Sequence, residues 1–327
     1  MTQPPPRYPL RAIVRLDKLA LVLGVSLDLL LAVSKDASSR YRLAKLIVKP
    51  DGSTRQPLDA KVPLKGIQRR IKERILEKVV FPDYLTGSLK GRDARANARL
   101  HVGASIVLSE DIANFFPSTK DTLVFKIWRQ FFGFAPDVAE ILTSLTTKDG
   151  ELPQGACTSS YLANLAFWRE EHRLYEVFRA QGIAYSRYVD DVSVSSKRRL
   201  SNEELSACIK NVYGMMGRSG FRPRRKKQEI QRANSPMLVT KLLANRRPAI
   251  SVKERQAIRA SLYQLEQSVA AKAGDDLSSK LESIAGRVNR LCQMHPVEGE
   301  RLKVRVRVLR GQIGMGASEV CGPVTGQ

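Results

Sequence analysis

Residues 183–195 have the sequence IAYSRYVDDVSVS, in which two adjacent aspartates interrupt a run of strand-forming residues. Apolar and polar side chains alternate on both sides of residues 190–191, which is typical of two β-strands joined by a tight turn. The stretch therefore predicts a β-hairpin with an acidic tip. An unpaired carboxylate is unfavourable in such a strand, so Arg187 or Lys197 is a candidate to neutralise it. A solvated turn is the plain alternative.

A second apolar segment upstream also ends in a carboxylate. Residues 105–108, SIVL, predict a buried strand that delivers Glu110 and Asp111 to its end. Two strands that each present a carboxylate at one end can form a shared site for Mg²⁺, which prefers oxygen ligands and leaves positions for water and phosphate. Two such ions activate an attacking hydroxyl and stabilise a leaving pyrophosphate. Asp111, Asp190 and Asp191 are therefore candidate ligands for phosphoryl-transfer chemistry.

The composition indicates a polyanionic partner. The chain has 327 residues, enough to bury a substantial core, and a formal net charge of +23. Nucleic acid is the commonest partner of such a positively charged protein, because neutralising its phosphates releases bound counterions. The alternative is a basic surface without a nucleic-acid partner. The cysteines and histidines are scattered without metal-site spacing: Cys157, Cys208, Cys292, Cys321, His101, His172 and His295. We therefore expect neither disulfides nor zinc.

The apolar stretch at residues 19–33 contains Asp28 and is shorter than the about 20 residues that cross a bilayer. It also lacks the pattern of a signal peptide. We therefore expect no membrane association and a cytoplasmic location.

Local patterns predict the remaining elements. The Pro-rich residues 1–10 are expected to be poorly ordered. Residues 16–33 predict helices broken near residues 24–26, and residues 42–57 predict a basic hairpin with an Asp-Gly turn. A helix is expected from about Pro63, with apolar residues at helical spacing.

The later part of the chain predicts mainly helices. Residues 87–99 are small, basic and turn-prone, and a helix is expected to open after residues 154–155. Residues 251–254, SVKE, fit a capping box at the start of a helix, and a second helix follows. Residues 302–308, LKVRVRV, alternate apolar with basic, which favours a strand.

Several short boxes, in order and at approximately matching spacing, resemble the reverse transcriptase family and specifically its bacterial retron type. The boxes are DIANFFPS at residues 111–118, LPQGACTS at 152–159 continued by LANL at 162–165, YVDD at 188–191, Gly220-Phe221 followed by Lys227, and LVT at 238–240. The resemblance covers about residues 16–240. Two positions depart from it: Lys241 replaces the expected glycine, and Pro57 replaces a usual aliphatic residue.

The resemblance implies roles for the carboxylates and their neighbours. Asp111 and Asp190 would be the main metal ligands, with Asp191 as the third carboxylate and the backbone carbonyl of Ile112 assisting. Tyr188 would touch the primer end.

The resemblance also implies a nucleotide pocket. Phe116 would lie under the deoxyribose as a steric gate against a 2′-hydroxyl, and Asn114 and Phe115 would offer backbone amides to the triphosphate. The other residues implied are Arg55, Lys49 and Lys65 from the fingers hairpin, Gln154 and Gly155 in the pocket wall, and Lys227 as an acid for the pyrophosphate. Core packing of the two phenylalanines and generic phosphate contact by Lys227 are the alternatives.

Residues 97–101, NARLH, match an element associated with retron enzymes. Asn97 and His101 would then contact RNA, although helix capping or packing is equally compatible with them. The basic C-terminal third supplies further candidates for RNA binding: Arg287, Arg290, Lys303, Arg305 and Arg307.

Together these features predict an α+β right-hand polymerase. We expect N-terminal helices and fingers at residues 1–100, a palm with an antiparallel sheet at 101–245 containing a fingers insertion at about 125–160, and a helical, RNA-binding thumb at 246–327. The resemblance implies RNA-templated DNA synthesis from deoxynucleotides with two Mg²⁺ ions. Another bacterial defence or group II intron-like reverse transcriptase, and a catalytically idle RNA-binding scaffold of the same fold, are the alternatives.

A retron enzyme would bind a structured noncoding RNA and prime from a 2′-hydroxyl in it. Its product would be a branched RNA–DNA hybrid (msDNA), often in an antiphage system with an effector protein. No stretch resembles a ribonuclease H, so a host ribonuclease H is expected to remove the template.

Overall fold

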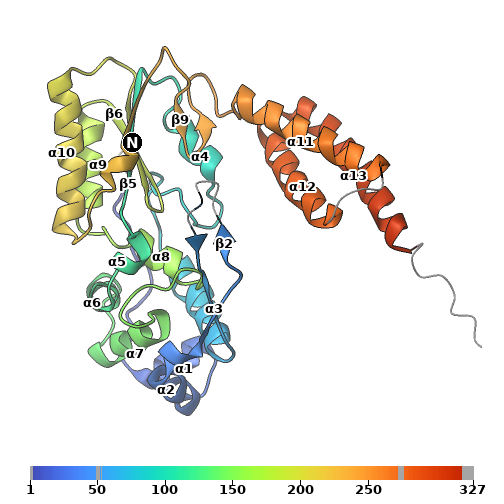
Figure 1. The fold of residues 1–327 in the computed structure, drawn as a ribbon. Coiled ribbons are helices and arrows are strands. Elements are labelled where there is room, and N and C mark those ends of the chain that lie inside the picture. Colours follow the sequence, from blue (N-terminus) through green and yellow to red (C-terminus); the bar gives the residue numbers. More distant parts are fainter. Residues whose placement is uncertain (1–2, 49–51, 53, 272–275, 319–327) are drawn as a thin grey trace, which may run out of the picture. The chain divides into compact units, whose positions relative to one another are not determined.

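The computed structural model describes residues 3–48, 52, 54–271 and 276–318. The chain divides into two compact units, Met1–Thr240 and Lys241–Gln327. Each unit is traced by its own colours in Figure 1. Within the described ranges, no helix has both the length and the apolarity that crossing a bilayer requires. Helices and strands are mixed as an α+β protein requires, which confirms the predicted class.

The elements of the first unit follow the hydrophobic patterns of the sequence. Its helices are α1 (Leu16–Leu23), α2 (Leu27–Lys35), α3 (Leu64–Arg74), α4 (Ala94–Arg99), α5 (Phe115–Ser118), α6 (Asp121–Lys126), α7 (Pro136–Thr146), α8 (Ser159–Asn164), α9 (Glu171–Ala180) and α10 (Asn202–Arg218), with the helical turns η1 (Ala37–Arg40), η2 (Leu76–Lys78), η3 (Ile127–Phe131) and η4 (Arg225–Lys227). Its strands are β1 (Tyr41–Leu43), β2 (Ile47–Val48), β3 (Thr54–Arg55), β4 (Leu58–Ala60), β5 (Ile106–Asp111), β6 (Ile183–Tyr188), β7 (Asp191–Ser196), β8 (Glu229–Arg232) and β9 (Leu238–Val239).

The N-terminal elements form where the sequence predicts them. α1 ends at Gly24 in the left-handed conformation (φ 63°), and α2 begins after Ser26, whose hydroxyl accepts a hydrogen bond from the Leu29 amide. This Gly and Ser supply a helix stop and an N-cap. The strands β2 and β3 pair as the predicted basic hairpin, whose turn falls largely outside the described residues.

A four-stranded antiparallel sheet, in the order β6-β7-β5-β8, forms the centre of the first unit. Figure 1 shows α9 and α10 on one side of this sheet and α4 on the other. Because side chains alternate along a strand, Tyr185 and Arg187 of β6 face α9, whereas Ser186 faces the opposite side. The predicted hairpin is therefore confirmed as β6 and β7, the two strands on which the acidic tip depends.

Two predictions about the ends of the chain are wrong. Within the described part of residues 1–10, Arg7 exchanges two backbone hydrogen bonds with Val80, and Tyr8 packs edge-on against Phe132. This anchors a segment that was expected to be poorly ordered. Residues 302–308 lie inside the helix α13 (Pro296–Ser318) rather than in a strand. Leu302, Val306 and Leu309 are buried there at helical spacing.

The second unit is helical. Its elements are β10 (Leu242–Leu243), α11 (Val252–Ala270), α12 (Leu277–Met294) and α13, and the three helices pack against one another. Ser251 caps α11 by accepting a hydrogen bond from the Glu254 amide, which is one half of the predicted capping box. The Glu254 side chain pairs with Arg290 of α12, so it serves the helix packing of this unit.

His101 follows α4 and forms hydrogen bonds with strands β6 and β7 of the sheet. The ring is 1% exposed, with Nε2 at 2.7 Å from Ser186 Oγ and Nδ1 at 2.8 Å from Ser195 Oγ. Burial lowers the pKa of His101 to about 4, because the apolar surroundings disfavour the imidazolium. The neutral ring is therefore part of the folded state.

We predict that His101 makes the first unit less stable in acid. The folded pKa lies below the unfolded one, so the stabilisation is present above the unfolded value and is lost as pH falls toward the folded value. The free energy of unfolding should fall by about 2 kcal/mol between pH 7.5 and pH 5. Urea unfolding followed by tryptophan fluorescence measures this change, because Trp128 and Trp168 both lie in the first unit. An equally steep pH dependence in His101→Gln would contradict the assignment to His101.

Candidate active site

The strand register brings two of the candidate carboxylates side by side. Asp111 at the end of β5 pairs in register with Asp191 at the start of β7. The Ile112 amide donates to the carbonyl of Asp190 at 3.0 Å, which ties the segment after β5 to the turn. Asp111 is 4% exposed, whereas Asp190 is half-buried and Asp191 is exposed. The sequence prediction that these aspartates come together from two strands is therefore consistent with the register.

Asp111 is neutralised by two cations of the basic segment around η4. Lys227 Nζ lies 2.8 Å from Asp111 Oδ2, and Arg224 Nε lies 3.5 Å from Oδ1. The Arg224 amide also donates to the Asp111 carbonyl at 2.7 Å. The basic segment around η4 thus places positive charge against the carboxylate. Arg187, one of the two cations considered from sequence, points to the opposite face of the sheet.

The donor set at this edge suits a divalent metal ion. Asp111 Oδ1 is buried and has no hydrogen-bond partner, so one of its acceptor positions is unused. Lys227 places a cation against the other oxygen. Within the described residues, no three His, Cys, Asp or Glu side chains are gathered closely enough to form a metal cluster. Because Mg²⁺ takes only one or two protein carboxylates, a closed cluster is not needed for it to bind.

A cavity of about 870 Å³ opens beside the turn. Its volume is in the range of small-molecule sites, roughly 300–1,000 Å³. The candidate residues that line it are Ile112, Asn114, Phe115, Phe116, Gln154, Tyr188, Asp190, Asp191 and Lys227. Asn114 adopts a left-handed conformation (φ 48°) and leads into α5. Phe115 is 2% exposed and stacks on Phe167, so it is a core aromatic, while half-buried Phe116 packs edge-on against it.

Other nucleotide candidates lie elsewhere. Lys65 pairs with Asp59 and lines a separate cavity, which Gly155 also lines. Gly155 has φ 118°, and a Cβ there would lie 2.4 Å from the Leu58 carbonyl oxygen. This glycine therefore allows the loop to approach β4 closely. Lys49 and the side chain of Arg55 lie outside the described residues.

The candidates for RNA contact are mostly engaged within the protein. Asn97 is 0% exposed and its Oδ1 accepts from Thr86, which, with the burial of His101, favours the packing alternative for this element. A buried side chain cannot contact RNA directly. In the second unit, the pairs are Arg287 with Ser261, Arg290 with Glu254, Lys303 with Glu300 and Arg305 with Glu266. Arg307 is exposed.

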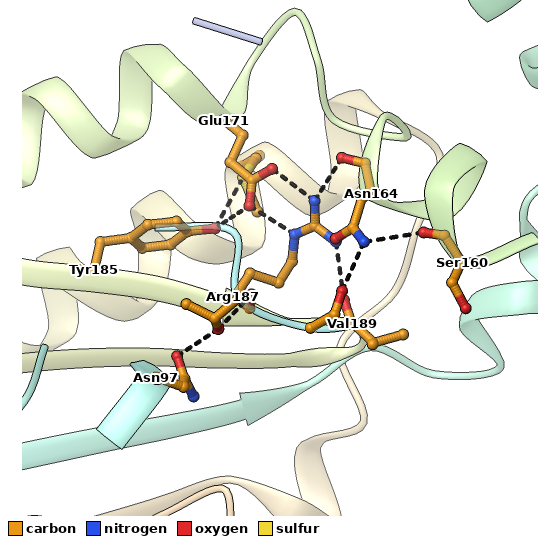
Figure 2. A network of polar contacts seen from close by, with 10 residues as sticks. Asn97, Ser160, Asn164, Glu171, Tyr185, Arg187 and Val189 are labelled. Carbon is orange, nitrogen blue, oxygen red and sulfur yellow. Dashed lines mark hydrogen bonds and ion pairs between the residues drawn. The ribbon is translucent and has the colours of Figure 1, made fainter. Parts of the chain in front are cut away.

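A buried arginine, which the sequence suggested only as a counter-charge for the acidic tip, supports the turn through its backbone (Figure 2). Arg187 is 0% exposed and makes a bidentate ion pair with Glu171 of α9, at 2.6 Å and 2.8 Å. Its Nη1 donates to the Val189 carbonyl at 2.9 Å and its Nη2 to the Asn164 carbonyl at 2.9 Å. Burial alone would lower the pKa of Arg187, but the Glu171 carboxylate raises it. The guanidinium therefore stays charged and holds the turn.

The turn itself is tightly enclosed. Val189 has φ 60°, a conformation that is unfavourable for a β-branched residue. Gly87 lies against it: a Cβ on Gly87 would be 2.3 Å from the Val189 nitrogen. Asn164 Nδ2 donates to the Gly87 carbonyl at 2.8 Å. Two segments distant in sequence thus fix the backbone that carries Asp190 and Asp191. The strand alternation could have indicated that Arg187 faces the core, but not which acid it meets.

Antiparallel strands that bring carboxylates to the edge of a nucleotide-sized cavity, with Lys227 and Arg224 beside them, are the arrangement of a nucleotidyltransferase. The family model described as Reverse transcriptase (RNA-dependent DNA polymerase) matches residues 47–239. The chain belongs to the reverse transcriptase family and is an RNA-directed DNA polymerase.

Within this family the chain is of the retron type. It is 34% identical over 301 residues to the Retron Se72 reverse transcriptase of Salmonella heidelberg, covering 90% of this chain and 79% of that protein. It is 30% identical over 315 residues to the Retron Ec48 reverse transcriptase of Escherichia coli, covering 91% and 76%. It is 27% identical over 310 residues to the Retron Mx65 reverse transcriptase of Myxococcus xanthus, covering 88% and 70%.

We predict that Arg187→Met destabilises the first unit by about 3–5 kcal/mol, because it leaves the Glu171 carboxylate buried without a partner. Arg179→Met, which removes the exposed pair with Glu176 on the same helix, should change stability by about 0–1 kcal/mol. Urea unfolding measures both. The double variant Arg187→Met with Glu171→Leu should regain stability but not DNA synthesis, because the Val189 carbonyl has lost its donor. Full polymerase activity in that double variant would show that Arg187 only balances charge.

We also predict that Gly87→Ala impairs DNA synthesis, since the new methyl group must displace the turn at Val189. A displacement of about 1 Å at a catalytic group lowers the rate by about 100-fold. Gly66→Ala on α3, where nothing lies within 4 Å of the added carbon, is the matched control. Steady-state primer extension measures both variants, and equal rates would contradict the close contact.

Proposed function

We propose that this chain is the polymerase of a retron, which copies part of a structured noncoding RNA and primes from a 2′-hydroxyl of that RNA. The product would be a branched RNA–DNA hybrid. The observation that carries this proposal is the likeness to proteins named as retron reverse transcriptases over about nine tenths of the chain. Partnership with an effector protein in antiphage defence, and template removal by a host ribonuclease H, belong to the same proposal.

The proposal assigns polymerase subdomains to the two units. Residues 1–100 are the fingers, residues 101–245 the palm with a fingers insertion at about 125–160, and residues 246–327 the thumb. The antiparallel sheet and the acidic turn support the palm assignment. The boundary between the compact units after Thr240 lies near the proposed start of the thumb.

We propose that Asp111, Asp190 and Asp191, with the Ile112 carbonyl, hold two Mg²⁺ ions. The bound ions would supply charge for the attacking hydroxyl and the leaving pyrophosphate. Lys227 Nζ is 2.8 Å from Asp111 Oδ2 in this structure, so its ammonium group neutralises this carboxylate. When a nucleotide is present, Lys227 would turn to the pyrophosphate and donate its proton there.

The cavity beside the turn would hold the deoxynucleotide. Half-buried Phe116 lines it and would pack under the sugar, where a 2′-hydroxyl does not fit. The Phe115 side chain is committed to the core, so its contribution would be the backbone amide at the start of α5. Gln154 would line the base-pair side, and Tyr188 would meet the primer end.

We predict that Asp190→Asn abolishes primer extension, because an amide cannot replace a metal-binding carboxylate, while RNA binding stays within about twofold. Asp137→Asn on the exposed surface of α7 is the matched control and should retain activity. Extension of a primed RNA template with labelled deoxynucleotides measures the first property, and filter binding the second. DNA synthesis by Asp190→Asn at the rate of the unaltered protein would contradict the proposed mechanism.

The retron assignment has its own test. Nucleic acid that copurifies with the protein should resolve into an RNA part and a DNA part after separate treatment with DNase and RNase, with the two parts covalently joined. A group II intron-like enzyme would instead retain RNA without linked DNA. This outcome separates the two kinds of reverse transcriptase even where both polymerise DNA.

A further inference from the structure

Another cavity, of about 720 Å³, lies within the helical second unit. Helices α11 and α13 form its walls, with Arg255 and Arg259 one helical turn apart on α11, and Arg301 and Arg305 one turn apart on α13. Arg247, from the segment before α11, completes a set of five guanidinium groups. Arginines so arranged surround a concave site of nucleotide size.

The cavity carries a large excess of positive charge. Among the described residues that line the cavity, Glu298 is the acidic one. It pairs with both Arg255 and Arg259. Glu266 pairs with Arg305 from outside. In the described part of the chain, Arg247 and Arg301 form no ion pair, and both are exposed. The unpaired guanidinium groups leave a positive field that attracts an anion.

Two further features point to an anion. Arg255 Nε is buried and has no hydrogen-bond partner, so this guanidinium has a donor that Glu298 does not use. α13 begins at Pro296 in the cavity wall, so the positive end of its helix dipole adds to the field. The same field acts on His295, whose pKa is lowered by burial and by the charges of Arg255 and Arg247.

We propose that this cavity binds the phosphodiester backbone of RNA, an inference that rests on the proposed function of the second unit. Its described lining has no Phe, Tyr or Trp side chain on which a base could stack. Recognition is therefore by charge and by paired donors, which suits a phosphate at a bend of a structured RNA rather than a particular base. In RNA, the phosphates on either side of the bound one could contact Arg247 and Arg301, which are exposed. A free nucleotide has no such neighbouring phosphates.

The test uses the full-length protein and two matched double variants. Arg247→Gln with Arg301→Gln removes the two unpaired cations of the cavity. Arg246→Gln with Lys253→Gln removes two exposed cations of the same unit that do not line it. Both variants lose the same charge. Circular dichroism melting confirms that each retains its fold, and primer extension on an external template at saturating concentration reports separately on the proposed polymerase site.

The probe is a fluorescent RNA hairpin of about 20 nucleotides, titrated at several KCl concentrations. The cavity variant should bind about tenfold more weakly at 0.1 M KCl, with a slope of log Kd against log [KCl] smaller by about two. The control variant should change clearly less. Equal losses in both variants would overturn the proposal. So would binding of inorganic phosphate or a nucleoside monophosphate that depends on Arg247 and Arg301 while hairpin binding does not, because the cavity would then serve a small anion.

Discussion

The ion pair between Arg187 and Glu171 is the constraint on which the active site depends. Both side chains are almost completely buried, and removing two charges from water costs several kcal/mol for each ion. The bidentate geometry, the carbonyls of Asn164 and Val189, and the faces of the Phe115 and Phe167 rings surround the guanidinium. Hydrophobic residues could fill this space with less penalty. A charged network, however, also specifies where the turn between β6 and β7 must lie.

This constraint places backbone strain at the proposed active site. A β-branched residue in the left-handed region, as at Val189, costs of order 1–3 kcal/mol and persists only when its surroundings determine it. Arg187 holds the carbonyl of that residue from one side, and the segment at Gly87 closes on its nitrogen from another. Asp190 and Asp191 therefore project from a backbone that is fixed before any substrate arrives. Such preorganisation is what positions charge for phosphoryl transfer.

The sequence was sufficient for the elements whose signals are local. The hairpin at residues 183–195 follows from alternation and the strand ending at Asp111 from its apolar run, and their pairing places the carboxylates together. Long-range partners have no such signal: Lys227 and Arg224 neutralise Asp111, and Arg187, considered as a counter-charge for the acidic tip, pairs with Glu171. The alternation in residues 302–308 was misleading because Leu302, Val306 and Leu309 also satisfy a helical spacing, which packing in the second unit selects. Lys241, which stands where a glycine was expected, adopts a left-handed conformation (φ 63°), which glycine adopts more readily than lysine.

Net charge alone could not locate an RNA-binding surface either. A value of +23 counts every basic residue equally, but Arg290 and Arg305 already hold carboxylates on neighbouring helices, where they stabilise the packing of the second unit. Partly exposed pairs of this kind contribute little to stability, about 0–1 kcal/mol, so they neither forbid nor favour exchange with phosphate. Cations without a carboxylate are different, because a phosphate meets them with no pair to break. Unpaired arginines that line a cavity, as Arg247 and Arg301 do, rather than the basic residues as a whole, are therefore where we expect an anion to bind most favourably.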